Sequence, residues 1–296
     1  MDLATRPVTV PDHSTRTAAI GAIAAMCTVG SLTAISATIG DYPFYGGQAV
    51  RYGVAALILL LIARLRRVPL PRLGTRDLAL LTGLAATGLA GFNLCLVEGA
   101  KHASPATIGT VVGAAPILLA LAGPLQQRRR PSPRIVGAAV LVAAGAALAN
   151  GLGSGSGTGL LWALGALGGE ACFALLAVPL LPRLGPILVS AYAAAIAVPM
   201  LLAVGLCTDG TVLLRVPTTA EAAAYTYITL VVTVGAFLLW YGSLARLGAE
   251  RGGLFTGVIP IAAALSTMVL GLGVPSAADF AGAGLVGLGV GIGLRP

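Results

Sequence analysis

The chain has 296 residues, of which 57% are hydrophobic and 9% are charged, and its formal net charge is +8. Soluble domains carry about 25% charged residues, so a soluble protein of this length would lack the groups that cover its surface. The composition therefore excludes a soluble globular protein. It predicts an integral membrane protein with the lipid bilayer as its main surroundings.

Ten stretches of the chain are free of charge or nearly so, and most approach the ~20 residues that a helix needs to cross ~30 Å of hydrocarbon. The charges inside them are Arg51 and Glu170. We therefore expect an all-α protein with ten transmembrane helices. In chain order the predicted spans are Thr17–Ile39, Gly46–Ala63, Leu78–Val97, Ser104–Leu125, Ile135–Asn150, Thr158–Val178, Pro186–Leu206, Ala222–Tyr241, Gly252–Gly271 and Phe280–Leu294.

The basic residues lie mostly on one side of the predicted membrane. If the tail 1–16 is cytoplasmic, the loops that share its side hold most of the Lys and Arg residues. The positive-inside rule then places both termini in the cytoplasm, and we expect a multi-pass membrane protein. The positive charge is thus a topology signal, and nucleic acid is not an expected partner.

A glycine and proline pattern occurs twice. Gly-x-x-x-Gly-x-x-Pro ends at Pro116 in the predicted fourth helix and at Pro260 in the ninth, an offset of 144 residues. The repetition predicts two five-helix halves, 17–150 and 160–296, joined by a flexible Gly/Ser connector at 151–159. Because five is odd, the halves would be inverted repeats, as in transporters whose substrate site lies between the repeats.

The repeated residues suggest a mechanism as well as a symmetry. Pro116 and Pro260 should interrupt helices in the middle of the membrane. With Gly113 and Gly257 about one turn earlier, they could form symmetry-related hinges for alternating access. Static kinks that only shape the packing are the alternative.

Four features together resemble a known family. They are Pro43–Arg51 at the second helix, Gly99–Ala106 before the fourth, Gly-x-x-Pro in the fourth and ninth, and glycine-spaced fifth and tenth helices. In these the chain resembles the EamA-type transporters of the drug/metabolite transporter superfamily. The resemblance implies a carrier that exports metabolites, often amino acids, through a central cavity. Together with the lack of a eukaryotic sorting signal, it favours a bacterial inner membrane as the location. Where the family often has an acidic residue after the fourth helix, this chain has Gln126.

Glu170 is the carboxylate inside a predicted span. It lies roughly 18 Å into a ~30 Å hydrocarbon core, counted along the sixth helix. A carboxylate at that depth usually faces a cavity or a partner. We expect Glu170 to bind the ammonium group of a substrate or to carry a proton, and a structural acid that is hydrogen-bonded to another helix is the alternative.

Arg51 lies near the outer end of the second helix. Its long stem could snorkel to the outer interface, or its charge could attract carboxylates near the mouth of the cavity. Together with Glu170 it could bind both ends of a zwitterion.

The remaining candidates for the substrate site are polar or aromatic residues within the spans: Asn93, Gln48, Ser31, Phe237 and Trp162. Hydroxyl groups in helices often bond to their own backbone instead. Trp162, Trp240 and Tyr241 also lie near helix ends, where aromatic residues form belts at the membrane interface.

The sequence does not suggest an enzyme. HExxH and GxSxG patterns are absent and no metal-ligand spacing occurs, so we expect no catalytic residue, cofactor or metal. The expected function is a secondary transporter that exports a small-molecule substrate, with amino acids as the first candidates. The alternatives are a multidrug carrier, a carrier of nucleosides or sugar derivatives and, with less support, a channel or a lipid scramblase. The chain could act as a monomer or a homodimer.

Overall fold

A chain this apolar has to satisfy its own backbone hydrogen bonds, and an α-helix does so within one segment. The computed structural model describes residues 12–295 except 37, 38, 40, 41, 152, 209, 211, 272 and 273, and it omits the side chains of 12–14 and 33. The described residues form helices and no β-strand, apart from one isolated bridge between Ala103 and Gly155. The all-α prediction is confirmed.

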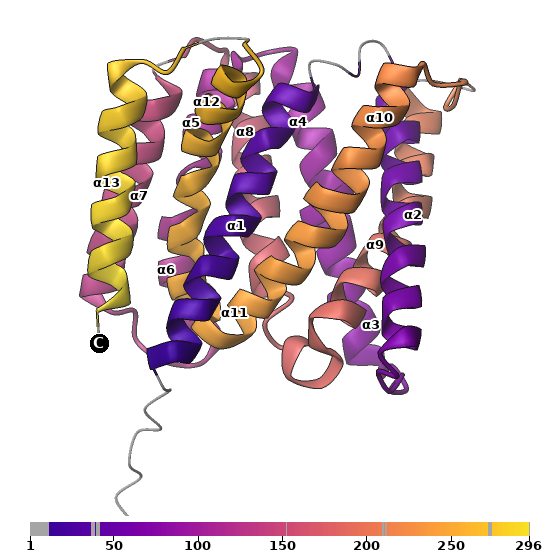
Figure 1. Ribbon diagram of the computed structural model, residues 1–296, viewed down its shortest axis with the longest axis horizontal. Coiled ribbons are helices and arrows are strands. Elements are labelled where there is room, and N and C mark those ends of the chain that lie inside the picture. Colours follow the sequence, from indigo (N-terminus) through magenta and orange to yellow (C-terminus); the bar gives the residue numbers. More distant parts are fainter. Residues whose placement is uncertain are drawn as a thin grey trace, which may run out of the picture.

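The helices pack side by side in one bundle that runs between two faces (Figure 1). The first part of the chain contains α1 (Asp12–Ser36), α2 (Phe44–Leu65), α3 (Thr75–Leu84), η1 (Ala85–Gly91), α4 (Phe92–Ala100), α5 (Pro105–Val112), α6 (Ala115–Gln126) and α7 (Pro133–Asn150). The second part contains α8 (Gly157–Leu175), α9 (Leu181–Thr208), α10 (Thr219–Tyr227), η2 (Ile228–Gly235), α11 (Ala236–Gly252), η3 (Gly253–Gly257), α12 (Val258–Val269) and α13 (Ala277–Leu294). Most of the predicted tail 1–16 lies outside the described residues, and α1 begins at Asp12.

Nine helical segments of the described chain are long and apolar enough to cross a membrane. Eight of them have 18 to 28 residues, and the other, Thr219–Val269, has 51. At 1.5 Å per residue, that run is more than twice as long as a ~30 Å core is thick. Gly248 within it has a φ of 73°, which departs from the helical path. The structure supports a multi-pass membrane protein, and the count of ten crossings stays a prediction.

The helices are irregular at positions that share one offset. η1 and η2 are π-helical, a wide form that is rare in proteins. Their last residues, Gly91 and Gly235, are 144 residues apart, which is also the offset between Pro116 and Pro260. The irregular turns therefore follow the same repeat as the glycine and proline pattern.

The predicted hinge residues lie at breaks between helices. Gly113 and Ala114 separate α5 from α6, and Gly257 ends the 3₁₀ helix η3 before α12. Pro116 and Pro260 are in the first turns of α6 and α12, where a missing N–H costs no intrahelical bond. The apolar runs 105–126 and 219–269 are thus interrupted just before each proline, as predicted, and each proline lies in the first turn of the helix that follows.

Both glycines at these breaks pack against α7. A Cβ atom at Gly113 would lie 3.1 Å from the Cβ of Ala146, and one at Gly257 would lie 2.3 Å from the Cγ1 of Val142. Close packing is therefore one role of these glycines. Their role as hinges stays a prediction.

α7 and α13 pack with their backbones almost in contact. A Cβ atom at Gly282 would lie 2.5 Å from the carbonyl oxygen of Gly145, and one at Gly145 would lie 2.7 Å from the carbonyl oxygen of Gly282. Small residues permit such an approach between membrane helices. Gly287, also on α13, has no neighbour within 4 Å of its Cβ position.

The connector between the predicted halves packs against the loop before α5. The backbone N–H of Ser104 donates to the oxygen of Ser154 at 2.9 Å, and that of Ser156 donates to the oxygen of His102 at 3.1 Å. Its last residues are already helical, because α8 begins at Gly157. The described connector residues are thus held in place, in contrast to the flexible linker that their composition predicts.

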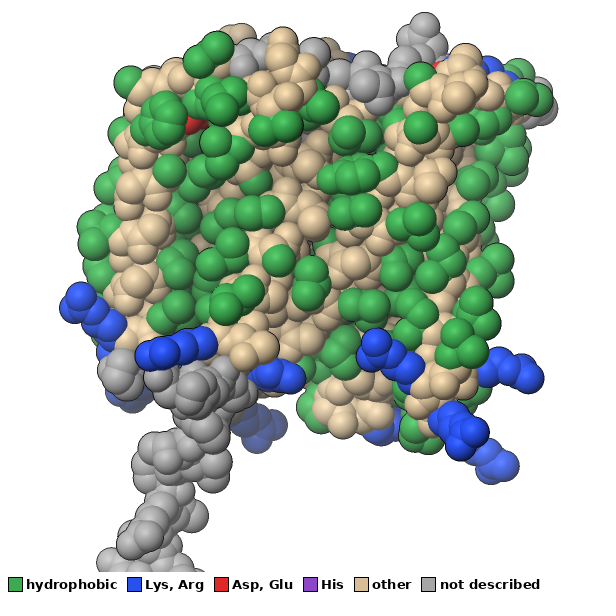
Figure 2. Space-filling view, in the orientation of Figure 1, with side chains coloured by type: hydrophobic (Ala, Val, Ile, Leu, Met, Phe, Trp, Pro, Cys, Tyr) green, Lys and Arg blue, Asp and Glu red, His purple; other side chains and the backbone are tan. Residues whose placement is uncertain are grey.

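Basic side chains gather at one end of the bundle. Figure 2 shows Lys and Arg along its lower edge, below a broad band rich in hydrophobic side chains. We call this end the basic face; it includes Arg64, Arg66 and Arg67 at the end of α2 and 128–130 after α6. The start of α1 and the C-terminus lie at this same face (Figure 1). The two ends of the described chain are therefore on one side, as the charge pattern predicts.

The contact between α7 and α13 predicts opposite effects for two alanine substitutions on the same helix. Gly282→Ala should destabilise the protein by about 1–3 kcal/mol, because backbone atoms of α7 cannot move aside as a side chain can. Gly287→Ala should be neutral or stabilising by up to about 1 kcal/mol, because alanine favours the helix and meets open space. Thermal unfolding in detergent measures both, and equal midpoints for the two variants would contradict the packing described.

Candidate functional site

A cavity of about 480 Å³ lies inside the bundle, lined by residues of α1, α2, α4, α8, α10, α11, α12 and both π-helical segments. At one end Tyr42 and Ala100 lie near the face opposite the basic face, and at the other Phe173 and Trp240 lie deeper. Its polar lining consists of Ser36, Tyr42, Gln48, Arg51, Tyr52, Asn93, Glu170 and Tyr225. The lining is otherwise mostly apolar, which is typical of a site for a small organic molecule.

Five of the seven predicted site residues line this one cavity: Glu170, Arg51, Asn93, Gln48 and Phe237. They come from helices far apart in the sequence, and the sequence gives no direct sign that they meet. Charged and polar side chains in apolar helices collect there because a cavity is where they can stay hydrated.

Glu170 contributes a carboxyl group to the lining of the cavity. It is half-buried on α8. No hydrogen bond or ion pair joins its carboxylate to another described residue. The alternative of a structural acid bonded to another helix thus finds no support among the described contacts. A carboxyl group in this position is available to a cation or a proton.

Arg51 is held inside the bundle. Its side chain is only 6% exposed, so the expectation that it snorkels to the interface is wrong. Its Nε donates to the hydroxyl of Thr233 at 2.6 Å, and Nη1 donates to Oε1 of Gln48 at 3.0 Å. The guanidinium carbon also lies 5.1 Å from the centre of the Tyr52 ring, a cation–π distance.

Asn93 is fixed by neighbouring groups. Its Nδ2 donates to the carbonyl oxygen of Leu89 at 2.7 Å and to the hydroxyl of Tyr52 at 3.3 Å. The oxygen of its amide receives no hydrogen bond from a described residue. Asn93 can therefore offer one acceptor to a molecule in the cavity.

The rings of Phe173 and Phe237 line the deep end of the cavity, and the ring of Tyr241 packs against both of them. The ring centres of Phe173 and Phe237 are 5.1 Å apart, as are those of Phe173 and Tyr241. The Tyr241 hydroxyl donates to the backbone oxygen of Phe173 at 3.3 Å. Tyr241 and Trp240 are buried here, so their predicted place in an interfacial belt is wrong. We call Phe173, Phe237 and Tyr241 the aromatic floor.

Two predicted site residues lie elsewhere. Ser31 shares a hydrogen bond of 2.8 Å with Tyr227 and lines a second, more apolar cavity of about 330 Å³ between α1, α10 and α12. Trp162 is half-buried on α8, close to Gly99, and does not line the main cavity. The depth of a residue along a helix did not indicate which way its side chain faces.

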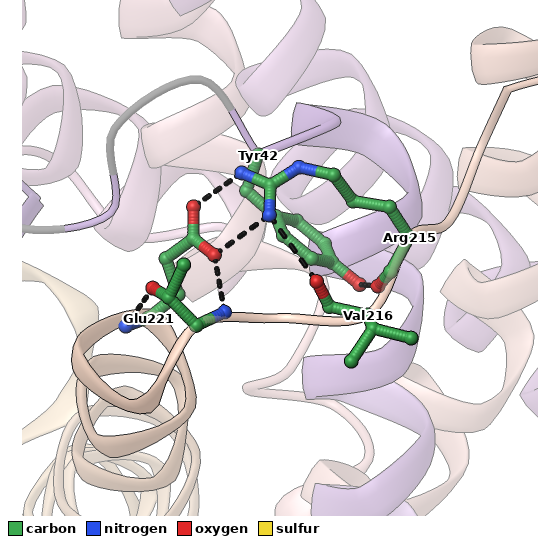
Figure 3. Close-up of polar contacts among 5 residues, drawn as sticks. Tyr42, Arg215, Val216 and Glu221 are labelled. Atoms are coloured by element: carbon green, nitrogen blue, oxygen red, sulfur yellow. Dashed lines mark hydrogen bonds and ion pairs between the residues drawn. The ribbon is translucent and has the colours of Figure 1, made fainter.

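Tyr42, Arg215 and Glu221 close part of the face opposite the basic face, and we call them the clasp (Figure 3). Arg215 forms an ion pair with Glu221 through both of its terminal nitrogens. Glu221 is 4% exposed and also accepts from the backbone N–H of Thr218 at 2.7 Å. The Tyr42 hydroxyl donates to the carbonyl oxygen of Arg215 at 3.0 Å, and its ring lies 5.0 Å from the guanidinium.

The clasp is continuous with the cavity. Tyr42 lines the cavity and packs edge-on against Tyr225, another lining residue, with ring centres 5.2 Å apart. The segment that carries Arg215 also approaches α2, since a Cβ atom at Gly46 would lie 1.7 Å from the carbonyl oxygen of Leu213. The sequence signal for this region is the capping box from Thr218 to Glu221, which our sequence analysis missed.

Separate contacts join helices at the basic face. Arg183 pairs with Asp77 at 2.6 Å, and Arg129 lies 3.6 Å from Glu250. Gln126, which stands where an acidic residue is often found, donates to the backbone oxygen of Leu175 at 3.0 Å. Polar contacts therefore hold helices together on both sides of the cavity. Among the described residues, His, Cys, Asp and Glu side chains form no group that could hold a metal ion.

The comparisons with known proteins agree with this architecture. Residues 16–151 match the model of the EamA-like transporter family. The chain is also 26% identical over 255 residues to "Uncharacterized transporter YetK" of Bacillus subtilis (strain 168); the match covers 83% of this chain and 77% of that protein. The predicted resemblance to EamA-type transporters is therefore confirmed over residues 16–151.

The fold of this chain is shared with a protein of known crystal structure. The two chains align with a TM-score of 0.76 at 19% sequence identity, over 94% of this chain and 97% of the other. At that identity the similarity concerns the fold alone.

The clasp predicts a coupled effect of two substitutions. Arg215→Gln should lower the free energy of unfolding by about 1–3 kcal/mol, because it leaves the buried Glu221 carboxylate without its charge-assisted hydrogen bonds. Glu221→Gln should cost less, because the exposed Arg215 guanidinium that it leaves can be hydrated. The double variant should lose less than the sum. Thermal unfolding in detergent measures this cycle. The exposed pair of Lys101 and Glu98 is the control, since its loss should cost less than about 1 kcal/mol; strict additivity at the clasp would count against a direct pair.

Proposed function

We propose that this EamA-type transporter is a secondary carrier that exports small metabolites through the central cavity by alternating access. The observation that carries the proposal is the Glu170 carboxyl group, which faces the cavity without a hydrogen bond or ion pair to a described residue. Such a group inside a membrane bundle usually marks a substrate or proton pathway. Glu170 would bind a substrate ammonium group or carry the coupling proton.

The proposed symmetry consists of two inverted five-helix halves, with the 51-residue run Thr219–Val269 crossing twice to give ten helices. Its support is the common offset of 144 residues, which relates the π-helical segments as well as the helix breaks at Gly113 and Gly257. In inverted-repeat transporters the substrate site lies between the repeats, and the cavity is lined from both parts of the chain.

The proposed orientation places the basic face, and with it both termini, in the cytoplasm of a bacterial cell. The support is the concentration of Lys and Arg at that face (Figure 2) and the positive-inside rule. The clasp would then face outward. Export requires the substrate to enter past the basic face. Contacts at that face, such as Arg183 with Asp77, would break in the inward-open state while the clasp stays closed. In the outward-open state the clasp would break and the contacts at the basic face would form again.

The proposed substrates are amino acids. Arg51 and Glu170 give the cavity one cationic and one acidic group, and aromatic and aliphatic side chains fill the rest of its wall. That combination suits a zwitterion with an apolar side chain. The apolar walls also suit a drug-like molecule, and a nucleoside or sugar derivative could bind to the polar groups. The counterflow assay described next can be repeated with these solutes, and it distinguishes a carrier of amino acids from a carrier of one of them.

Counterflow tests the carrier mechanism and its substrate. Purified protein in liposomes is loaded with unlabelled amino acids, and uptake of each labelled amino acid is followed. Saturable uptake that needs internal substrate is expected. Flux that does not saturate would indicate a channel, and movement of labelled lipid alone would indicate a scramblase. If folded protein shows no counterflow, amino acids are excluded as the substrates.

Removal of the charge at Glu170 should disable this transport. Glu170→Gln keeps the size of the side chain but can neither bind an ammonium ion as a counter-charge nor exchange a proton, so counterflow or its pH dependence should fall at least roughly tenfold. Glu98→Gln, which removes a carboxylate outside the cavity, is the matched control and should retain the activity. A full rate with unchanged pH dependence in Glu170→Gln would show that Glu170 is structural.

The proposed hinges at Gly113, Pro116, Gly257 and Pro260 predict a kinetic effect. Pro260→Ala should slow exchange in the counterflow assay without preventing membrane insertion, because the η3–α12 junction loses the fixed φ that sets its geometry. Pro69→Ala, in the exposed loop after α2, is the control. An unchanged exchange rate in Pro260→Ala would favour a purely static break.

A further inference from the structure

Arg51 is a buried cation without a counter-ion among the described residues. Its side chain is 6% exposed, and the described ion pairs join other residues: Lys101 with Glu98, Arg129 with Glu250, Arg183 with Asp77, and Arg215 with Glu221. A buried charge is unfavourable unless an opposite charge or hydrogen bonds compensate it. The protein supplies hydrogen bonds and leaves the charge of Arg51 unbalanced.

Neutral groups fix the orientation of this guanidinium. Thr233 accepts from Nε at 2.6 Å and Gln48 accepts from Nη1 at 3.0 Å. The face of the Tyr52 ring lies 5.1 Å away. These partners hold the planar guanidinium from two edges and one side, without neutralising it.

The π-helical segment η2 sets the position of Thr233. The Thr233 hydroxyl donates to the carbonyl oxygen of Ile228, five residues earlier, at 2.9 Å. Because its only hydrogen is used in this bond, the hydroxyl oxygen can only accept at Arg51. The wide turn therefore fixes the Thr233 hydroxyl as an acceptor for Arg51. In a regular α-helix the hydroxyl would bond to the carbonyl four residues earlier, and its oxygen would have a different position.

The remaining donors of Arg51 face the cavity. Nη2 donates to no described residue, it is not among the enclosed atoms that lack a partner, and Arg51 lines the cavity. An arginine in this state offers free N–H groups in a fixed plane, which match the oxygens of an anion.

We propose that Arg51 is an anion subsite, that the transported molecule carries a carboxylate which binds there, and that Thr233 and Gln48 are its positioning residues. This inference rests on the proposed function, because it assumes that the cavity holds the substrate. A single guanidinium with an acidic residue, Glu170, in the same cavity favours a singly charged carboxylate over a doubly charged phosphate. The apolar body of the molecule would contact Phe237 and other rings of the aromatic floor.

Fluorescence of Trp240 tests the subsite without knowledge of the natural substrate. The chain has two tryptophans, and Trp240 lines the cavity whereas Trp162 does not. A Trp162→Phe background therefore reports on the cavity alone. The probes are 3-phenylpropanoate and 3-phenylpropanamide, which share the body and differ in the charge of one group. The carboxylate should bind roughly 10- to 100-fold more tightly than the amide, as a charge-assisted hydrogen bond predicts.

Variants in this background assign the preference to Arg51. Arg51→Gln should bind both probes equally. Thr233→Val, which keeps the shape but loses the acceptor, should reduce the preference at least about threefold, while Thr233→Ser should retain it; these two variants decide the case even if Arg51→Gln does not fold. Lys101→Gln removes an exposed cation outside the cavity and should leave the preference unchanged.

Three results would overturn the anion subsite: equal binding of the two probes, no saturable response to either, or a preference that survives in Arg51→Gln and Thr233→Val. The counterflow assay separates this failure from that of the proposed function. Counterflow without a preference for the carboxylate probe would reject the anion subsite and retain the proposed carrier function. A preference for the carboxylate probe without transport of any solute would retain the anion subsite and reject the proposed carrier function.

Discussion

Hydrocarbon offers no hydrogen-bond partner, so every charge inside this bundle depends on the few polar groups that the chain itself provides. The interior charges meet this constraint in different ways. Glu221 is paired with Arg215 at one end of the bundle, whereas Arg51 has neutral acceptors and Glu170 has the cavity. Charges that are paired hold helices together, and charges that are not paired are available to a solute.

The same constraint explains the irregular helices around the cavity. A regular α-helix uses all of its backbone groups and directs its hydroxyl side chains to its own carbonyl oxygens. The π-helical segment η2 changes the spacing, and Thr233 reaches Arg51 on another helix as a result. In η1, the carbonyl of Leu89 accepts from Asn93, which also lines the cavity. The Asn93 bond has the ordinary spacing of four residues, whereas the Thr233 bond spans five, so the wide turn of η2 is the one that positions a polar side chain.

The sequence was sufficient to predict the membrane character, the helical class and the EamA resemblance, because apolar length and charge spacing reflect the thickness of the bilayer directly. It also indicated five residues of the cavity, since a polar side chain in an apolar helix has few other places to lie. It failed where the face of a helix mattered. Ser31 and Trp162 point elsewhere, and Trp240 and Tyr241 lie near a helix end but are covered by other helices.

The breaks before α6 and α12 show a second limit. Their residues were found from the repeat, but a proline in an apolar stretch does not reveal whether it bends a helix or begins one. That depends on the turn before it: Gly113 and Ala114 end one helical path, and η3 ends another. Phe173 gave no signal at all, because an aromatic residue in a long apolar segment is indistinguishable from one that faces lipid.

The closely packed glycines differ in which substitutions they can accept as the sequence diverges. The space at Gly257 is limited by a side chain, that of Val142, so a larger residue at 257 can be accommodated if 142 becomes smaller. Gly145 and Gly282 are limited by each other's backbone, which no exchange of side chains can remove. The first position can therefore drift together with its neighbour, while the second pair can change only if the two helices move apart along their whole length.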